Sequence, residues 1–223
     1  MTTSNIKANP LGAALCEKKW ARWTALALLA SAMFFAYIFV DILSPLQELL
    51  QEQRGWDPVA YGHFAGSEPF LNVFVFFLIF AGIILDKMGV RFTAVLSGAV
   101  MVAGGSLNYY AVTQGFQDSA VAVFLTENLN LPSAWWNVTP FYAGMPASAK
   151  LAAIGFMIFG CGAEMAGITV SRGIVKWFKG KEMALAMGVE MAIARVGVAV
   201  VVVGAPVIAS IVPVEVSRPV AYA

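Results

Sequence analysis

Five long apolar runs limit what this chain can fold into. They cover about residues 23–40 (with a possible continuation to 46), 60–85, 92–113, 151–171 and 183–211. A helix needs about 20 mostly apolar residues to cross the hydrocarbon layer of a bilayer, which is close to the length of each run. Their content of Ala, Leu, Met and Phe favours helices, whereas the strands of a membrane barrel would alternate polar and apolar residues. We therefore predict an all-α membrane protein with five transmembrane helices.

The composition excludes several other classes of protein. Of the 223 residues, 60% are hydrophobic and 12% are charged, whereas a soluble domain carries about 25% charged residues. The net charge of +1 provides no field that would attract a nucleic acid. Two cysteines and one histidine cannot build a disulfide framework or a metal cluster. With no nucleotide loop or catalytic triad in the sequence, we expect no enzyme, no cofactor and no metal site.

The basic residues predict which ends of the helices face the cytoplasm, because cytoplasmic loops are enriched in Lys and Arg. Ten of the fourteen fall in the tail 1–22, in the connection after 85 or in the connection after 171. The other side has three, namely Arg54, Lys150 and Arg218. We therefore expect a multi-pass protein with a cytoplasmic N-terminus and with segment 212–223 outside. The tail carries no acidic dileucine sorting signal, which favours a plasma (inner) membrane.

One connection is long and contains several aromatic residues. Residues 114–150 form a polar stretch that this orientation places outside the membrane. Trp135 and Trp136 suit the headgroup zone, where amphipathic rings prefer to lie. A loop resting on the membrane is the plain interpretation, and a substrate lid or a surface for a partner is the alternative.

The cytoplasmic connection between the second and third runs has regularly spaced Gly and charged residues. They are Gly82, Asp86, Lys87, Gly89 and Arg91. We expect a glycine at 82 to allow close helix packing, the carboxylate at 86 to meet the amides that start the next helix, and a glycine at 89 to permit a tight turn. An ordinary basic inner loop is the alternative. The spacing resembles the signature loop of the major facilitator superfamily of transporters, which implies that these five residues help to latch one access state.

A second group of motifs follows between residues 159 and 197. It reads FGCGAE at 159–164, KWFKGKE at 176–182 and AIARVG at 192–197. The combination resembles the branch of that superfamily that includes the lysosomal dipeptide transporters and their bacterial relatives. The resemblance implies that Glu164 and Arg195 line a central cavity and hold the amino and carboxyl ends of a peptide. It also suggests Asp41, with Leu46 and Gln47 after it, as a third substrate-binding position.

The position of these charges in the apolar runs supports a functional role independently. A charged side chain at the centre of a span costs about 2.5–3.5 kcal/mol on insertion scales and is a functional candidate by default. At a rise of about 1.5 Å per residue, Glu164 lies roughly 12 Å from the cytoplasmic end of its run and Arg195 roughly 20 Å. A structural ion pair between the two helices is the alternative.

Three further polar or charged residues lie within the apolar runs, namely Glu190, Glu68 and His63. Glu190 lies about 140° around the helix from Arg195, so it is either a proton site or a packing partner for another helix. Glu68 and His63 are expected to be wetted residues at the outer end of their run rather than ligands.

The facilitator fold has two six-helix halves with the substrate between them. We therefore predict that this chain is the N-terminal part of such a fold, with residues 23–211 in its first bundle and the C-terminal bundle missing. The predicted function is a secondary carrier that moves dipeptides or other small peptides by alternating access, in contact with lipid. A carrier for an organic anion or a sugar, and a non-transporting membrane assembly module, are the alternatives.

Overall fold

The structure, a computed structural model, describes residues 17–130, 141–142 and 144–211. Trp135, Trp136 and segment 212–223 lie outside the described residues. The described chain is helical, and its elements in order are α2 (Lys19–Asp41), η1 (Ser44–Leu46), α3 (Gln47–Arg54), α4 (Pro58–Ser67), α5 (Phe70–Phe74), α6 (Phe77–Val112), α7 (Gln114–Gln117), α8 (Ala120–Asn128), α9 (Ala147–Phe178) and α10 (Met183–Ile211).

Three helical stretches of the described chain are long and apolar enough to cross a membrane. They are Lys19–Arg54, Ala147–Phe178 and Met183–Ile211, and they contain three of the five predicted runs. Large apolar side chains on α2 and α10, such as Leu28, Phe35 and Val203, are exposed, as suits helices that face lipid rather than water. These features are consistent with an integral membrane protein.

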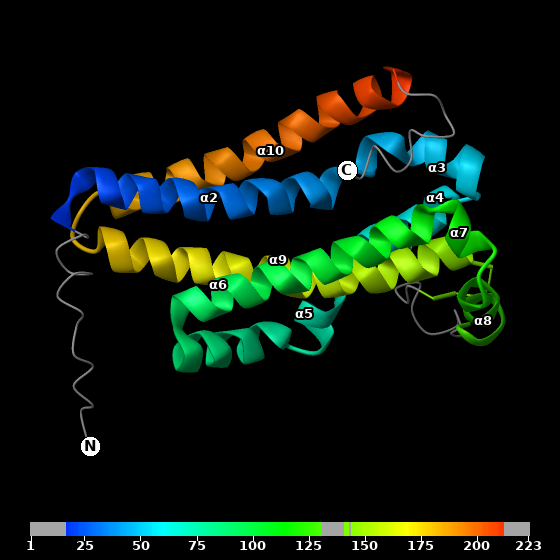
Figure 1. The fold of residues 1–223 in the computed structure, drawn as a ribbon, viewed down its shortest axis with the longest axis horizontal. Coiled ribbons are helices and arrows are strands. Elements are labelled where there is room, and N and C mark those ends of the chain that lie inside the picture. The colour runs from blue at the N-terminus through cyan, green and yellow to red at the C-terminus, as the bar shows by residue number, and fades with distance from the viewer. Residues whose placement is uncertain (1–16, 131–140, 143, 212–223) are drawn as a thin grey trace.

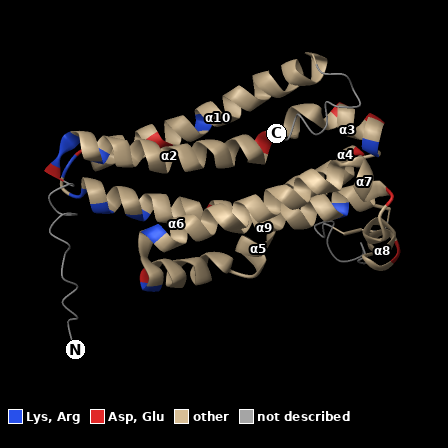
Figure 2. Cartoon of the chain, viewed as in Figure 1, with Lys and Arg blue, Asp and Glu red and all other residues tan. Residues whose placement is uncertain are grey.

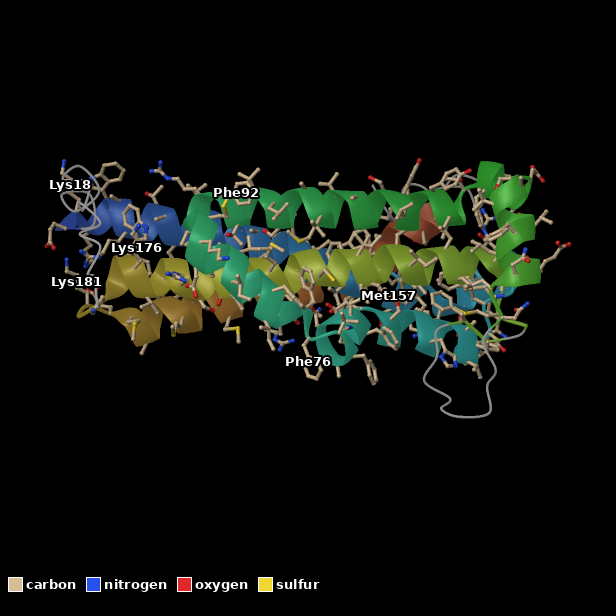
Figure 3. The ribbon with its side chains drawn as sticks, turned by 90° about the horizontal axis from the view of Figure 1, so that it is seen from below. Lys18, Phe76, Phe92, Met157, Lys176 and Lys181 are labelled. Carbon is tan, nitrogen blue, oxygen red and sulfur yellow. The ribbon has the colours of Figure 1, made fainter. Side chains whose placement is uncertain are left out.

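The predicted helix over residues 60–85 is wrong as a single element, because the structure divides this run at two places. α4 ends at Ser67 and α5 begins after Pro69, whose ring removes a backbone donor and interrupts a helix. Phe76 then separates α5 from α6 in a left-handed conformation, with φ of 55°. Its side chain is 63% exposed and lies at the outer surface of the molecule (Figure 3).

The predicted helix over residues 92–113 is the second part of α6. Gly89 interrupts α6 with φ of 81° and ψ of 169°, a conformation that glycine adopts without steric penalty. The chain therefore reverses at Gly89, as Figure 1 shows, and the second part of α6 runs alongside α9. This confirms the turn predicted at Gly89.

α9 is the central helix of the described chain. It packs along α6 on one side, while α10 packs against α2 (Figure 1). The α6–α9 contact depends on missing side chains, because a Cβ atom at Gly104, Gly155 or Gly162 would overlap atoms of the facing helix. Close backbone approach at small residues is how membrane helices associate.

Basic residues gather at the end where α2 begins and α9 ends (Figure 2). There Lys181 Nζ lies 2.9 Å from a Glu17 carboxylate oxygen, and an Arg22 guanidinium nitrogen lies 3.5 Å from Glu182. The turn at Gly89 stops short of this end, since Phe92 lies well inward of Lys18 and Lys181 in Figure 3.

Candidate functional site

A cavity of about 390 Å³ lies between α2, α9 and α10, beside the break between α4 and α5. Its polar lining consists of Tyr37, Glu68, Glu164, Ser171 and Glu190. Met33, Val40, Ile174, Met187 and Met191 contribute most of its apolar wall. A mostly apolar pocket with a few convergent polar groups is the usual form of a small-molecule site, and this volume falls in the usual range.

The cavity contains Glu164, as predicted from the sequence. This carboxylate projects from the middle of α9 and is half-buried. Gly160 precedes it by one helical turn and therefore lies on the same face. A Cβ at Gly160 would overlap the main-chain carbonyl of Glu68 and would lie 3.0 Å from its carboxylate. The glycine thus lets the α4–α5 break approach α9 and brings Glu68 beside Glu164.

The expectation that Glu68 is a wetted residue at the outer end of its run is therefore corrected. Its helix is broken immediately after it, at Pro69, so the side chain turns inward to line the cavity. A Glu–Pro pair inside an apolar run was the signal for this role, because discontinuous helices often form binding sites in transporters. His63 lies instead against the ring of Tyr142, with centroids 5.0 Å apart.

Glu190 enters the cavity from α10. Its side chain is only 8% exposed, and it forms no hydrogen bond or ion pair with the described residues. A buried carboxylate without a partner is energetically unfavourable, so its presence marks Glu190 as a candidate for a functional role. The position in the cavity wall leaves both a proton site and a packing role open for this residue.

Arg195 lies one to two turns further along α10 and does not line the cavity. Its guanidinium is exposed and lies over the ring of Tyr37, 5.3 Å from the ring centroid. Arg195 therefore contacts a residue that lines the cavity but lies outside the cavity itself. The alternative of a structural ion pair with Glu164 is wrong for this structure, because no such pair lies within 4 Å among the described residues.

Asp41 is the last residue of α2 and also lies outside the cavity. Its neighbour Val40 is a lining residue, whereas Asp41 is not among the residues that line the cavity. The structure therefore places Glu164, Glu190 and Glu68 around one cavity and leaves Asp41 outside it, at the end of α2.

The predicted latch loop makes a contact that differs from the expected one. Asp86 forms an ion pair with Arg172 of α9, rather than meeting the amides of the next helix. Both side chains are largely exposed, so the pair is a surface contact. The close packing expected at Gly82 is also absent, because nothing lies within 4 Å of the position that its Cβ would take. Lys87 and Arg91 lie exposed at the same turn.

Two polar groups at the ends of the bundle were not predicted. At one end Lys181 lowers the pKa of Glu17, mainly through their hydrogen bond, and the pKa of Glu182 is lowered by its own backbone amide and by Arg22. At the other end Lys150 is 1% exposed, and its ammonium donates to the Leu125 carbonyl and to Asn130. This buried lysine fastens α8 to the first turn of α9.

Comparison of the chain with known protein families, with curated proteins and with solved structures found no match.

Proposed function

We propose that this chain is part of a secondary carrier of the major facilitator type, which moves small solutes across a plasma membrane by alternating access. The observation that carries the proposal is an acidic cavity inside a bundle of apolar helices. Charged residues within membrane helices are rare and mark substrate or ion pathways by default. Small peptides are the favoured solutes, because Glu164 suits an ammonium group and Arg195 suits a carboxylate.

The two predicted residues need not touch each other to hold one peptide. The charged ends of a dipeptide are separated by roughly 7 Å, or two residue rises of an extended chain. Glu164 would receive the ammonium inside the cavity. Arg195 would leave the face of Tyr37 and grip the carboxylate with two parallel hydrogen bonds, a geometry that Arg provides and Lys does not.

The turn at Gly89 is the proposed latch. The Asp86–Arg172 pair joins this turn to α9, the helix that carries Glu164. Exposed ion pairs contribute about 0–1 kcal/mol, so such a contact can form in one access state and open in another at little cost. We propose that the N-terminus and this turn face the cytoplasm.

Uptake measurements test this function and separate its alternatives. Cells that express the protein receive a radiolabelled dipeptide, an organic dianion or a hexose in parallel. Saturable dipeptide uptake that falls at least ten-fold in Glu164→Gln and in Arg195→Lys supports the proposal. Uptake of the anion or the hexose instead supports another carrier. No binding of any of the three solutes to the purified chain favours an assembly module. Glu52→Gln, an exposed acid on α3, is the control for loss of one charge.

A further inference from the structure

Two segments that are far apart in the sequence meet at one end of the bundle and concentrate positive charge there. Residues 17–22 and 176–182, called the basic surface below, contain six basic and two acidic residues and carry a net charge of +4. The whole chain carries +1, so the remaining residues together carry −3. Lys18, Lys176 and Lys181 lie at this end in Figure 3, and Figure 2 shows the same concentration of basic residues where α2 begins and α9 ends.

Side-chain contacts hold the two segments of the basic surface together. The ring of Trp23 meets the ring of Phe178 edge to face, with centroids 5.7 Å apart. The Arg22 guanidinium lies 5.9 Å from the centroid of the same Phe178 ring and 3.5 Å from the carboxylate of Glu182. The first turn of α2 is therefore fixed against the end of α9, and the lysines of both segments extend from one surface.

Most of the positive charge of this surface has no acidic partner. Both acidic residues, Glu17 and Glu182, already form ion pairs with Lys181 and Arg22. The other four basic residues have exposed side chains and form no ion pair with a described residue: Lys18, Lys19, Lys176 and Lys179. Because like charges repel one another, an anionic group placed among these lysines would stabilise the arrangement.

Apolar side chains flank the exposed lysines. Trp20 follows Lys19 and is 67% exposed, and the exposed side chains of Met183 and Leu185 lie in the first turn of α10, directly after the basic surface. Tryptophan rings prefer the headgroup level of a membrane, and lysine stems lie along apolar groups while the ammonium reaches the polar region. A soluble polyanion would leave these apolar side chains in water, whereas a phospholipid covers both kinds of group.

We propose that the basic surface binds anionic phospholipids, with the lipid phosphates among the exposed lysines and the acyl chains against Trp20 and the first turn of α10. An anionic leaflet strengthens the binding of a nearby Lys or Arg by about five-fold per charge. The basic surface shares no residue with the cavity. The inference is therefore independent of the carrier function and of the solute that is carried.

Native mass spectrometry of the purified protein in detergent tests the inference. The probes are phosphatidylglycerol, which is anionic, and phosphatidylcholine with the same acyl chains. We expect phosphatidylglycerol to bind about ten-fold more tightly or better, because several lysines act on one headgroup. The preference should shrink as ammonium acetate is added, since salt screens exposed charges. Equal binding of the two lipids overturns the inference. Tighter binding of poly-glutamate than of phosphatidylglycerol also overturns it, in favour of a soluble acidic partner.

Variants locate the lipid site. The double variant Lys18→Gln/Lys179→Gln removes one exposed lysine from each segment and should reduce the preference for phosphatidylglycerol about ten-fold. Lys18→Arg/Lys179→Arg keeps both charges and should retain the preference. Lys87→Gln/Arg91→Gln removes two exposed charges at the Gly89 turn and should leave the preference largely unchanged. Equal reductions in the two glutamine variants would indicate a general effect of charge and overturn the assignment to the basic surface. Melting curves verify that each variant is folded.

Discussion

The two sides of α9 differ in how they meet their neighbours. Toward α6, the helix presents glycines that bring backbones into contact, and Gly155 and Gly162 face Gly104 and Ser97 with no room for another atom. Toward α2 and α10, the same helix presents Glu164 and encloses a cavity. Gly167, on this side, has only one ordinary contact, at 3.9 Å to Met33.

This difference separates stability from function along a single helix. Close packing of small residues provides the van der Waals contact that holds membrane helices together. A cavity provides no such contact, and the carboxylates that line it are energetically unfavourable in an apolar surrounding. Substitutions on the two sides should therefore change stability in opposite directions.

The largest expected change in stability follows substitution at the contact between α6 and α9. Gly104→Val should lower the free energy of unfolding by about 3 kcal/mol, because overpacking displaces the backbone it meets, here the backbone of Phe159 and Gly155. Gly98→Val, on the same helix with open space around its Cβ position, is the control and should change stability little. Unfolding in denaturant, followed by circular dichroism, measures both. A similar loss in the two variants would contradict the comparison.

The next effect concerns the N-terminal end of α9. Lys150→Met keeps the length of the side chain but removes the donor to Leu125 and Asn130. Loss of hydrogen bonds from a charged, buried group should lower the free energy of unfolding by about 2 kcal/mol and expose α8 to protease. Lys176→Met, at an exposed site on the same helix, should have no such effect. Equal digestion of α8 in the two variants would rule out the fastening role of Lys150.

In the cavity, a substitution should raise the free energy of unfolding instead of lowering it. Glu190→Gln removes a buried carboxylate that has no partner among the described residues, so it should raise the free energy of unfolding by about 1 kcal/mol. The melting temperature in nanodiscs without ligand measures this, with Glu52→Gln as the control. A lower melting temperature would mean that the carboxylate of Glu190 has a structural role.

The smallest effect is expected at the end where α2 meets the α9–α10 turn. Lys181 holds the pKa of Glu17 below its ordinary value of 4.5. A depressed folded-state pKa means that the ion pair stabilises the protein above pH 4.5, and that this stabilisation disappears as pH falls through the folded value. Lys181→Gln should therefore lower the melting temperature slightly at pH 6 and not at pH 3. Lys179→Gln, an exposed control, should show no pH-dependent difference, and an equal shift at both pH values would contradict the ion pair.

Much of the helical architecture was predictable from the sequence, because length and apolarity alone define a membrane helix. The predicted run 183–211 coincides with α10, and Gly89 forms the predicted turn. The run 60–85 was not predictable as three pieces from its hydropathy. Only Pro69 signals the first break, and nothing local requires the left-handed conformation of Phe76.

The candidate site was predictable in part, for a related reason. Glu164 and Glu190 are isolated charges in apolar runs. The free-energy cost of a charge inside a membrane helix identified them as candidates for a functional site. Glu68 was not predicted as a cavity residue, because its position there depends on Gly160. That glycine lies far away in the sequence and faces Glu68 only in the folded chain. The position of Arg195 over Tyr37 also depends on how α2 packs against α10, which no periodic pattern in either helix specifies.

The breaks on either side of α5 bear on hydration. Backbone groups that leave a helix need other partners, and hydrocarbon offers none. Asn72 of α5 adds a buried amide that has no hydrogen-bond partner among the described residues. Glu68 and Asn72 are therefore poorly suited to a dry, lipid-facing position, whereas the apolar side chains of Val73, Phe74 and Phe76 are exposed. A bilayer would favour keeping these two polar side chains toward the interior of the protein, which is where an aqueous solute would have to pass.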